Sequence, residues 1–172
     1  DSPMSRGLGD VYKRQGEAIR DFRYPDRIVI GSNVKKAFNI MKKLYAPLTN
    51  KGSKFFTTSR RGAELIKYAS NAFLATKITF INELANLCEK SGVNIEDISL
   101  GMGSDSRIGG RFLRAGPAYG GSCFPKDTKG LVSAAEKYKI NLSVVKSVIK
   151  SNQERVNLLT KRVHKILGSN LK

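Results

Sequence analysis

Cys123 lies in a run of residues whose types suit nucleophilic chemistry: Tyr119-Gly120-Gly121-Ser122-Cys123-Phe124-Pro125-Lys126-Asp127. Glycines before the cysteine permit unusual backbone angles, and Pro125 suits the first turn of a following helix. We therefore expect Cys123 at a helix entrance, where unpaired amides, the helix dipole and nearby Lys126 favour thiolate over thiol. Asp127, one helical turn further on, would act on a water or on a leaving proton. A lone free cysteine is usually just a small buried apolar residue, and the flanking residues disfavour that alternative here.

The segment Gly-Gly-Ser-Cys-Phe-Pro-Lys-Asp, residues 120–127, closely resembles the catalytic loop of the UDP-glucose 6-dehydrogenases. The resemblance extends from about residue 16 to the C-terminus. It implies that Cys123 is the nucleophile of an enzyme that oxidises a sugar's primary alcohol to a carboxylate. Two hydride transfers to NAD would pass through a thiohemiacetal and a thioester. In that scheme Asp127 organises the hydrolytic water, and Lys126 contributes to cofactor binding.

Two polar residues, Lys67 and Asn71, interrupt an apolar helical pattern four positions apart, so they project from one face. One reading is an exposed pair. However, the segment ELIKYASNAFLATK, residues 64–77, resembles the same family, and that likeness places both residues in the active site beside the cysteine. There a cation and an amide would hold the oxyanion of a tetrahedral intermediate.

Three arginines, Arg107, Arg111 and Arg114, fall in a glycine-bearing stretch after the predicted helix at residues 95–102. Guanidinium groups in such a loop suit a diphosphate, because each can give forked hydrogen bonds, although solvated basic residues are the alternative. The family resemblance implies that Arg107 reaches into the neighbouring subunit's sugar-nucleotide site. It also implies a substrate pocket lined by Phe112, Leu113, Tyr119, Gly120, Gly121 and Ser122. The resemblance also implies UDP-glucose over GDP-mannose or UDP-N-acetylmannosamine, because Arg107-Ile108-Gly109 and Phe112-Leu113 are in place, with Ser122 and Phe124 around the cysteine.

The elements that must position these residues are predicted to be mostly helical. We expect short strands at residues 27–30 and 55–58, with a helix between them that Ser32 or Asn33 caps and that ends near Tyr45. Further helices are predicted at residues 63–90, 95–102, 127–138 and 142–167; the second of these is short, and Gly168 ends the last. The predicted fold class is therefore mostly α: a helical central dimerisation domain with a small α/β remnant of an N-terminal Rossmann-like domain.

The helix predicted at residues 63–90 carries one apolar stripe, made of Ile66, Ala69, Phe73, Ile78, Ile81, Leu84, Ala85 and Cys88. From residue 62 to 91 it would run roughly 45 Å at 1.5 Å per residue. Such a helix needs more cover than so small a chain offers, so we expect a homodimer through residues 62–91, with Cys88 structural. On the last helix we expect these side chains to face a core: Val145, Val148, Ile149, Val156, Leu159, Val163 and Ile166.

The chain is expected to divide into four parts. Residues 1–15 match nothing in the family and are interpreted as a foreign or disordered tail, for example a translated adapter. Residues 16–60 would be the end of the NAD-binding domain, residues 61–167 the helical central domain, and residues 168–172 the start of a linker to a uridine-binding domain. The dinucleotide fingerprint is absent, because Ser106 stands where the last glycine after Gly101-Met102-Gly103 belongs. By the resemblance, that fingerprint and a catalytic glutamate would lie upstream.

Composition restricts the class further. The chain has 172 residues, 31 Lys and Arg against 14 Asp and Glu, and a net charge of +17, which favours anionic partners. Nucleic acid is disfavoured because the basic residues are spread out and no recognition motif accompanies them. Two cysteines form no disulfide framework, and no apolar run is long enough for a bilayer, so we expect a cytoplasmic protein without membrane partners. The single histidine, His164, lies among basic residues, which makes a histidine-based metal site improbable.

The sequence thus indicates a fragment of an NAD-dependent UDP-glucose 6-dehydrogenase that is inactive alone. The alternatives are a related GDP-mannose or UDP-N-acetylmannosamine dehydrogenase, a non-catalytic helical dimerisation module and, last, a basic nucleic-acid binder.

Overall fold

The computed structural model describes residues 18–168. The predictions for the tail 1–15 and for residues 169–172 fall outside the described residues. The chain separates into two compact units, residues 1–67 and 68–172. None of the described helices is long and apolar enough to span a bilayer.

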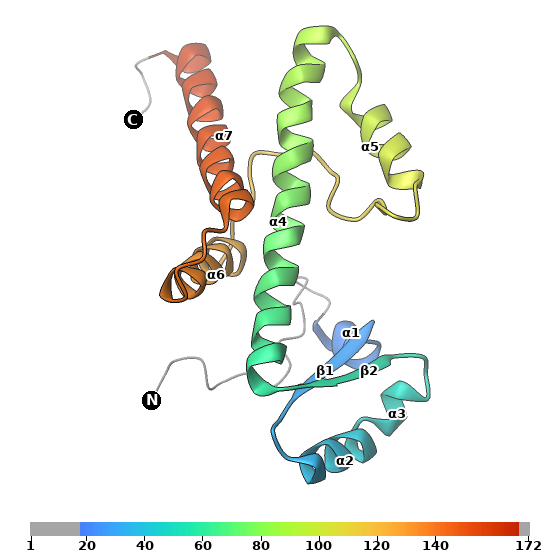
Figure 1. Ribbon diagram of the computed structural model, residues 1–172. Coiled ribbons are helices and arrows are strands. Elements are labelled where there is room, and N and C mark those ends of the chain that lie inside the picture. The colour runs from blue at the N-terminus through green and yellow to red at the C-terminus, as the bar shows by residue number, and fades with distance from the viewer. Residues whose placement is uncertain (1–17, 169–172) are drawn as a thin grey trace. The chain divides into compact units, whose positions relative to one another are not determined.

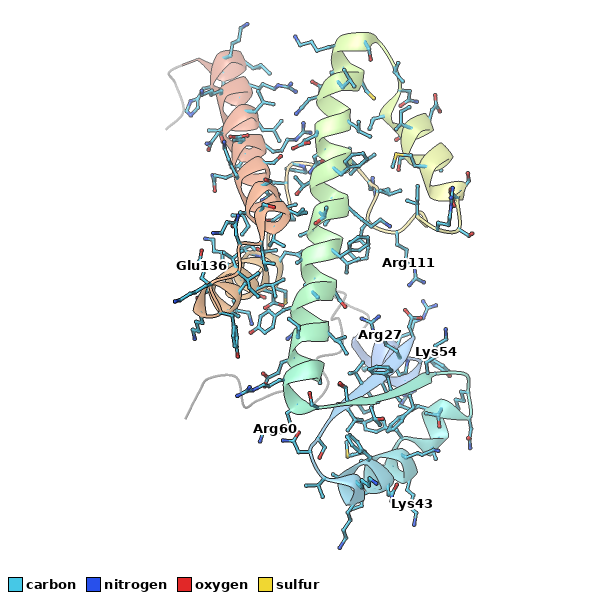
Figure 2. The ribbon with its side chains drawn as sticks, in the orientation of Figure 1. Arg27, Lys43, Lys54, Arg60, Arg111 and Glu136 are labelled. Carbon is cyan, nitrogen blue, oxygen red and sulfur yellow. The ribbon has the colours of Figure 1, made fainter. Side chains whose placement is uncertain are left out.

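The first unit is a small strand–helix–strand arrangement. It contains α1 (Ala18–Arg23), β1 (Arg27–Gly31), α2 (Lys35–Leu44), α3 (Ala46–Thr49) and β2 (Lys54–Thr58). The two strands are parallel and in register, from Arg27 opposite Lys54 to Gly31 opposite Thr58. Figure 2 shows Arg27 and Lys54 at the same end of this sheet. Parallel strands need a crossover, and α2 with α3 supplies it. Both predicted strands are confirmed, whereas α1 and α3 were not predicted.

The start of α2 corrects one prediction. Neither Ser32 nor Asn33 caps this helix, because its N-cap residue is Val34, which makes no side-chain cap hydrogen bond. The Ser32 hydroxyl instead accepts a hydrogen bond from the Val34 N–H at 3.1 Å, so it is used in the turn before the helix. Local side-chain bonds of this kind compete with capping.

The second unit consists of helices. The long α4 (Arg60–Ser91) begins in the first unit, and α5 (Ile95–Ser104), α6 (Phe124–Lys137) and α7 (Ser143–Leu167) follow. Helix α7 lies alongside α4 and runs in the same direction (Figure 1), because Ser151, Arg155 and Arg162 contact, in turn, Glu83, Asn86 and Glu89. Near the α6 to α7 connection, Lys146 pairs at 2.8 Å with Glu136, which Figure 2 labels on α6. The predicted helices and the mostly α fold class are confirmed.

The helix ends follow their local signals. At the start of α5, the Asn94 side chain accepts a hydrogen bond from the Glu96 N–H at 3.0 Å, as expected of an N-cap. At the end of α7, Gly168 has φ of 68°, a left-handed conformation that glycine adopts without strain. The predicted stop at Gly168 is confirmed.

The face that α4 buries differs from the predicted stripe. Its buried residues are Asn71, Ala72, Ala75, Thr79, Ile81, Asn82, Ala85 and Cys88. Phe73, expected on this stripe, is 66% exposed. Exposed Phe73, Phe80 and Leu87 are spaced by seven residues, so they form a second apolar stripe, here called the outer stripe. One helix therefore carries two apolar faces, and the described residues cover only one of them.

The core-facing prediction for α7 holds only near its start. Val148 is buried against Ala75 and Tyr119, whereas Val156, Val163 and Ile166 are exposed. Late in α7, Arg162 contacts Glu89 of α4 at 2.7 Å, and this polar pair lies at the surface. The prediction for those three residues is wrong because periodicity finds an apolar face but not whether another element lies against it.

Candidate active site

Cys123 stands where an irregular segment becomes a helix. Residues 113–123, here called the cysteine loop, lead into α6, for which Cys123 is the N-cap and Pro125 lies in the first turn. The Cys123 carbonyl accepts the Asp127 N–H at 2.8 Å. Just before the cysteine, Gly121 has φ of 73°, so the turn uses the left-handed freedom of glycine. The predicted position of Cys123 at a helix entrance is confirmed.

The Cys123 thiol is free and exposed. Its Sγ lies 3.7 Å from the Ser122 Oγ, within reach of a weak hydrogen bond. The other cysteine, Cys88, is free and buried on α4. An exposed thiol at a helix N-terminus can be approached by an electrophile, whereas a buried one cannot.

Asn71 and Asp127 meet in the interior, although 56 residues separate them. The Asn71 Nδ2 donates to the Asp127 Oδ2 at 2.6 Å, and Asp127 is only 1% exposed. No described residue hydrogen-bonds to the other carboxylate oxygen, Oδ1, although the exposed Lys126 Nζ lies 3.6 Å from it. The pair therefore ties the first turn of α6 to α4 and leaves one buried acceptor available.

Lys67 lies one turn before Asn71 on α4 and is half-buried. It belongs to the first unit, whereas Cys123 belongs to the second. Its expected place beside the cysteine stays a prediction.

Aromatic rings surround the start of α6. Tyr119 is buried against Ala75 and Val148, and its ring centroid lies 5.9 Å from that of Phe124 in an edge-on arrangement. The Phe112 ring contacts the same Phe124 ring at 6.3 Å. Burial raises the pKa of Tyr119 above its usual value, and a hydrogen bond with Thr128 opposes the rise. Leu113 is also fully buried. The structure thus gathers Phe112 and Tyr119, two predicted pocket residues, around the residue after the cysteine.

Arg107 is placed differently from the other predicted site residues. It lies in residues 105–112, here called the arginine loop, and its side chain is 87% exposed. The guanidinium bonds the Asp105 carboxylate, with Nη2 to Oδ2 at 2.6 Å and Nε to Oδ1 at 3.0 Å. These hydrogen bonds lower the pKa of Asp105 and raise that of Arg107. Arg107 therefore points to solvent instead of packing on the cysteine loop.

The arginine loop is joined to α4 through its backbone. The Lys77 Nζ donates to the carbonyls of Ile108 and Gly109, each at 3.0 Å. The close approach of Gly103 to Gly110 requires glycine, because a Cβ on Gly103 would lie 2.8 Å from the Gly110 Cα. Phe112 has φ of 66°, which is uncommon for a residue other than glycine.

Three residues that sequence reasoning missed hold the cysteine loop at Gly116 and Tyr119. Asn82 on α4 and Asn152 with Arg155 on α7 hydrogen-bond the backbone of Gly116 and Tyr119. The sequence does contain a pattern that could have identified them, because these polar side chains lie on helix faces that are otherwise predicted to face the core. Such residues need partners when buried, and an irregular backbone supplies them.

Comparisons with known proteins bear on this geometry. Residues 61–154 match the model of the UDP-glucose/GDP-mannose dehydrogenase family, central domain. A UDP-glucose 6-dehydrogenase of Rickettsia felis is 53% identical over 161 residues, covering 94% of this chain and 36% of that protein. One of Bacillus subtilis is 48% identical over 157 residues, covering 91% of this chain and 35% of that protein.

Solved structures agree in fold. A UDP-glucose dehydrogenase of the archaeon Pyrobaculum islandicum superposes with a TM-score of 0.84 at 36% identity, over 91% of this chain and 36% of that one. A UDP-D-ManNAc dehydrogenase of Pyrococcus horikoshii gives 0.72 at 26% identity, over 90% and 36%. The chain spans about a third of the length of the relatives it matches. Because the family model matches more than half of its residues, the chain belongs to the UDP-glucose/GDP-mannose dehydrogenase family.

Proposed function

We propose that this chain is the central part of an NAD-dependent UDP-glucose 6-dehydrogenase, which oxidises UDP-glucose to UDP-glucuronate. The observation that carries the proposal is the exposed thiol of Cys123 at the N-terminus of α6, where the buried Asp127 of the first turn is bonded by Asn71 of α4. The identity to proteins named UDP-glucose 6-dehydrogenase supports this substrate over the sugars of sister enzymes.

The chemistry requires a nucleophile that can also leave. Loss of a hydride and a proton from the primary alcohol gives an aldehyde, and the Cys123 Sγ adds to its carbon. The oxygen takes a proton, which gives a thiohemiacetal. Loss of the second hydride and of the hydroxyl proton gives a thioester. Water then breaks the C–S bond, so the carboxylate is released and the thiol is restored.

Asn71 and Lys67 are proposed to stabilise the negative oxygen that develops at each addition step. The Asn71 amide nitrogen carries two hydrogens, and Asp127 takes one. The same bond fixes the orientation of the amide, so its second hydrogen has a defined direction, as an oxyanion donor needs. Lys67, one turn away on α4, would add a positive charge.

Asp127 is proposed to organise the hydrolytic water. Its Oδ2 is used by Asn71, whereas its Oδ1 is buried and receives no hydrogen bond from the described residues. A buried acceptor without a donor is costly, and a water that donates to it would remove that cost. Asp127 would thereby hold a water within one helical turn of the thioester carbonyl.

NAD would take up the two hydrides, and only Lys126 of this chain is assigned to its binding. The side chain of Lys126 is largely exposed and lies next to Asp127. The sequence has no complete glycine fingerprint, so the residues present do not by themselves fit the whole cofactor. We propose that residues outside this chain provide the rest of the NAD site, because the relatives are nearly three times as long.

Substrate and partner assignments follow the same scheme. Phe112, Leu113 and the backbone of residues 119–122 would line the sugar pocket, and Arg107 would bind the diphosphate of a neighbouring subunit. The outer stripe of Phe73, Phe80 and Leu87 supports a homodimer through α4, because it is apolar and the described chain leaves it exposed. We place the enzyme in the cytoplasm. The predicted division at residues 15, 60 and 167 is kept as part of the proposal.

An NADH assay with a longer protein tests the proposal. The coding region would be expressed with both flanking regions and supplied with NAD and UDP-glucose, GDP-mannose or UDP-N-acetylmannosamine. We expect two NADH per UDP-glucose and little from the others. Faster turnover of GDP-mannose would favour a sister enzyme.

The 172-residue chain supplies the matched control. It should form no NADH, and calorimetry should detect no NAD binding, because a reactive thiol without a positioned acceptor carries out no oxidation. Saturable NADH production from this chain would overturn the assignment of the cofactor site. If neither protein forms NADH but both associate, the dimerisation module is the better reading.

A further inference from the structure

The cysteine loop has no regular secondary structure between residues 113 and 120, so its backbone groups need partners from elsewhere. Side chains supply them at three positions: the Ser99 hydroxyl donates to the Leu113 carbonyl at 2.6 Å, and Gly116 and Tyr119 are bonded more fully. At Gly116 and Tyr119 both backbone groups, the N–H and the carbonyl, are bound by helical side chains, which is the arrangement that a neighbouring strand would otherwise provide.

Asn152 binds both backbone groups of Tyr119. Its Oδ1 accepts the Tyr119 N–H at 2.8 Å, and its Nδ2 donates to the Tyr119 carbonyl at 3.0 Å. Two bonds from one planar amide fix the position and the orientation of this peptide unit together. A side chain of another length or shape cannot make both.

Asn82 and Arg155 together bind both backbone groups of Gly116. The Asn82 Oδ1 accepts the Gly116 N–H at 2.8 Å, and the Arg155 Nη2 and Nε donate to the Gly116 carbonyl at 3.1 and 3.3 Å. Arg155 also reaches the Asn82 carbonyl at 3.5 Å and the Asn86 side chain. The guanidinium therefore joins α4, α7 and the loop.

The spacing of the contacting residues along α7 matches the spacing of their partners along the cysteine loop. Asn152 and Arg155 are three residues apart on α7, so they lie on one face, and their targets Tyr119 and Gly116 are also three residues apart. The register of the loop against α7 is thereby set at two points. Asn82 is 2% exposed, and its Nδ2 has no partner among the described residues. An unpaired donor in the core lowers stability. We infer that Asn82 is kept there because its Oδ1 accepts the Gly116 N–H.

We propose that Asn152, with Asn82 and Arg155, is a positioning residue for Cys123. Tyr119 is four residues before the cysteine, and its ring packs on Phe124, the residue after it. When the Tyr119 peptide is fixed, the loop enters α6 along one path and Cys123 is held at the N-cap. The inference rests on the proposed function for its catalytic meaning, but the positioning can be measured without catalysis.

The first experiment uses the 172-residue chain with Cys88→Ala, so that a nitroxide spin label attaches only to Cys123. Asn152→Leu removes both bonds to Tyr119, Asn152→Asp keeps only the acceptor for the N–H, and Gln153→Leu makes the same change at the exposed neighbouring position. We expect the Tyr119 amide to exchange with solvent at least about 10-fold faster in Asn152→Leu and the label to become more mobile. Asn152→Asp should be intermediate, and Gln153→Leu should match the parent chain.

Equal exchange and equal label mobility in Asn152→Leu and Gln153→Leu would overturn the proposal. If circular dichroism shows that Asn152→Leu does not fold, Arg155→Lys takes its place, because it keeps the charge and loses the fork to Gly116. Increased label mobility in that variant supports positioning, and unchanged mobility contradicts it.

The second experiment uses the longer protein described above. A displaced nucleophile should lower kcat by about 10- to 100-fold in Asn152→Leu, while KM changes by less than about 3-fold. A fall in kcat no larger than that of Gln153→Leu would contradict the catalytic meaning. If the parent protein forms no NADH with any sugar nucleotide, the proposed function fails, and the exchange and label measurements still decide the positioning.

Discussion

The cysteine loop and the arginine loop are both irregular and both carry predicted site residues, but they are held in different ways. The cysteine loop is held by side chains from two long helices, α4 and α7, and its Tyr119 ring lies in the core. The arginine loop is bound to α4 by Lys77, and its predicted site residue, Arg107, bonds its near neighbour Asp105 and points to solvent.

The difference matches what each loop is proposed to do. A nucleophile must be held to within about 0.5 Å of its productive position, so its support has to be built into the fold. A guanidinium that binds a diphosphate needs a long, exposed and charged side chain, and the diphosphate can be bound to another subunit. The cysteine loop is thus held by this chain's own helices, whereas the Arg107 side chain of the arginine loop is exposed and accessible to a ligand or a second copy.

The largest expected effect comes from removing the nucleophile while keeping its support. In the longer protein, Cys123→Ser should lower turnover to the acid by about three orders of magnitude or more, because an alkoxide leaves far less readily than a thiolate. Mass spectrometry should detect a trapped ester or aldehyde-level adduct. The melting temperature should change little, since the Cys123 side chain is exposed. Full turnover by the serine variant would remove Cys123 from the mechanism.

The corresponding change in the arginine loop should act on binding. Arg107→Ala should raise KM for UDP-glucose by about 10- to 100-fold, because charge-assisted hydrogen bonds to the diphosphate are lost. The melting temperature should not fall, since the side chain is exposed. Arg114→Ala, at another exposed arginine, is the matched control. Equal KM values for the two variants would show that Arg107 has no special part in binding.

A third prediction concerns the second copy that the arginine loop would need. Residues 61–167 should form a dimer, and Phe80→Glu should convert it to a monomer, because a carboxylate in the outer stripe would be buried without a partner. Tyr138→Glu introduces the same charge at an exposed site at the end of α6 and should leave the dimer intact. Sedimentation distinguishes these states. A well-folded wild-type monomer at high micromolar concentration would contradict both the dimer and the reach of Arg107.

The smallest effect concerns the buried ring of the cysteine loop. Burial raises the pKa of Tyr119, so the folded state favours the neutral phenol. The neutral phenol therefore contributes to the free energy of unfolding. This contribution is fully present below the unfolded pKa of about 10 and is lost as the pH rises through the higher folded pKa. Tyr119→Phe should therefore lose less stability than the wild type between about pH 10 and pH 12. Urea unfolding would measure this, with Tyr138→Phe as an exposed control. If the free energy of unfolding falls equally with pH in Tyr119→Phe and Tyr138→Phe, the Tyr119 hydroxyl is not buried in solution.

The sequence alone predicted the features that depend on near neighbours. Pro125 and Gly121 placed Cys123 at a helix entrance, Gly168 marked the end of α7, and a long apolar pattern predicted α4. Each of these is decided within a few residues by backbone freedom or by helical periodicity. The nine residues around the cysteine were also enough to indicate the family that the comparisons show.

Only the tertiary structure decided which faces are covered and which polar groups meet. Asn71 pairs with Asp127 across 56 residues, and Asn152 binds Tyr119 across 33. Phe73 is exposed although it lies on an apolar helix, while Asn82 on the same helix is buried. An apolar side chain is more stable when it is buried, but whether another element packs against it depends on segments that are distant in the chain. A buried amide is stable only where another segment brings it a partner, and no local pattern records that meeting.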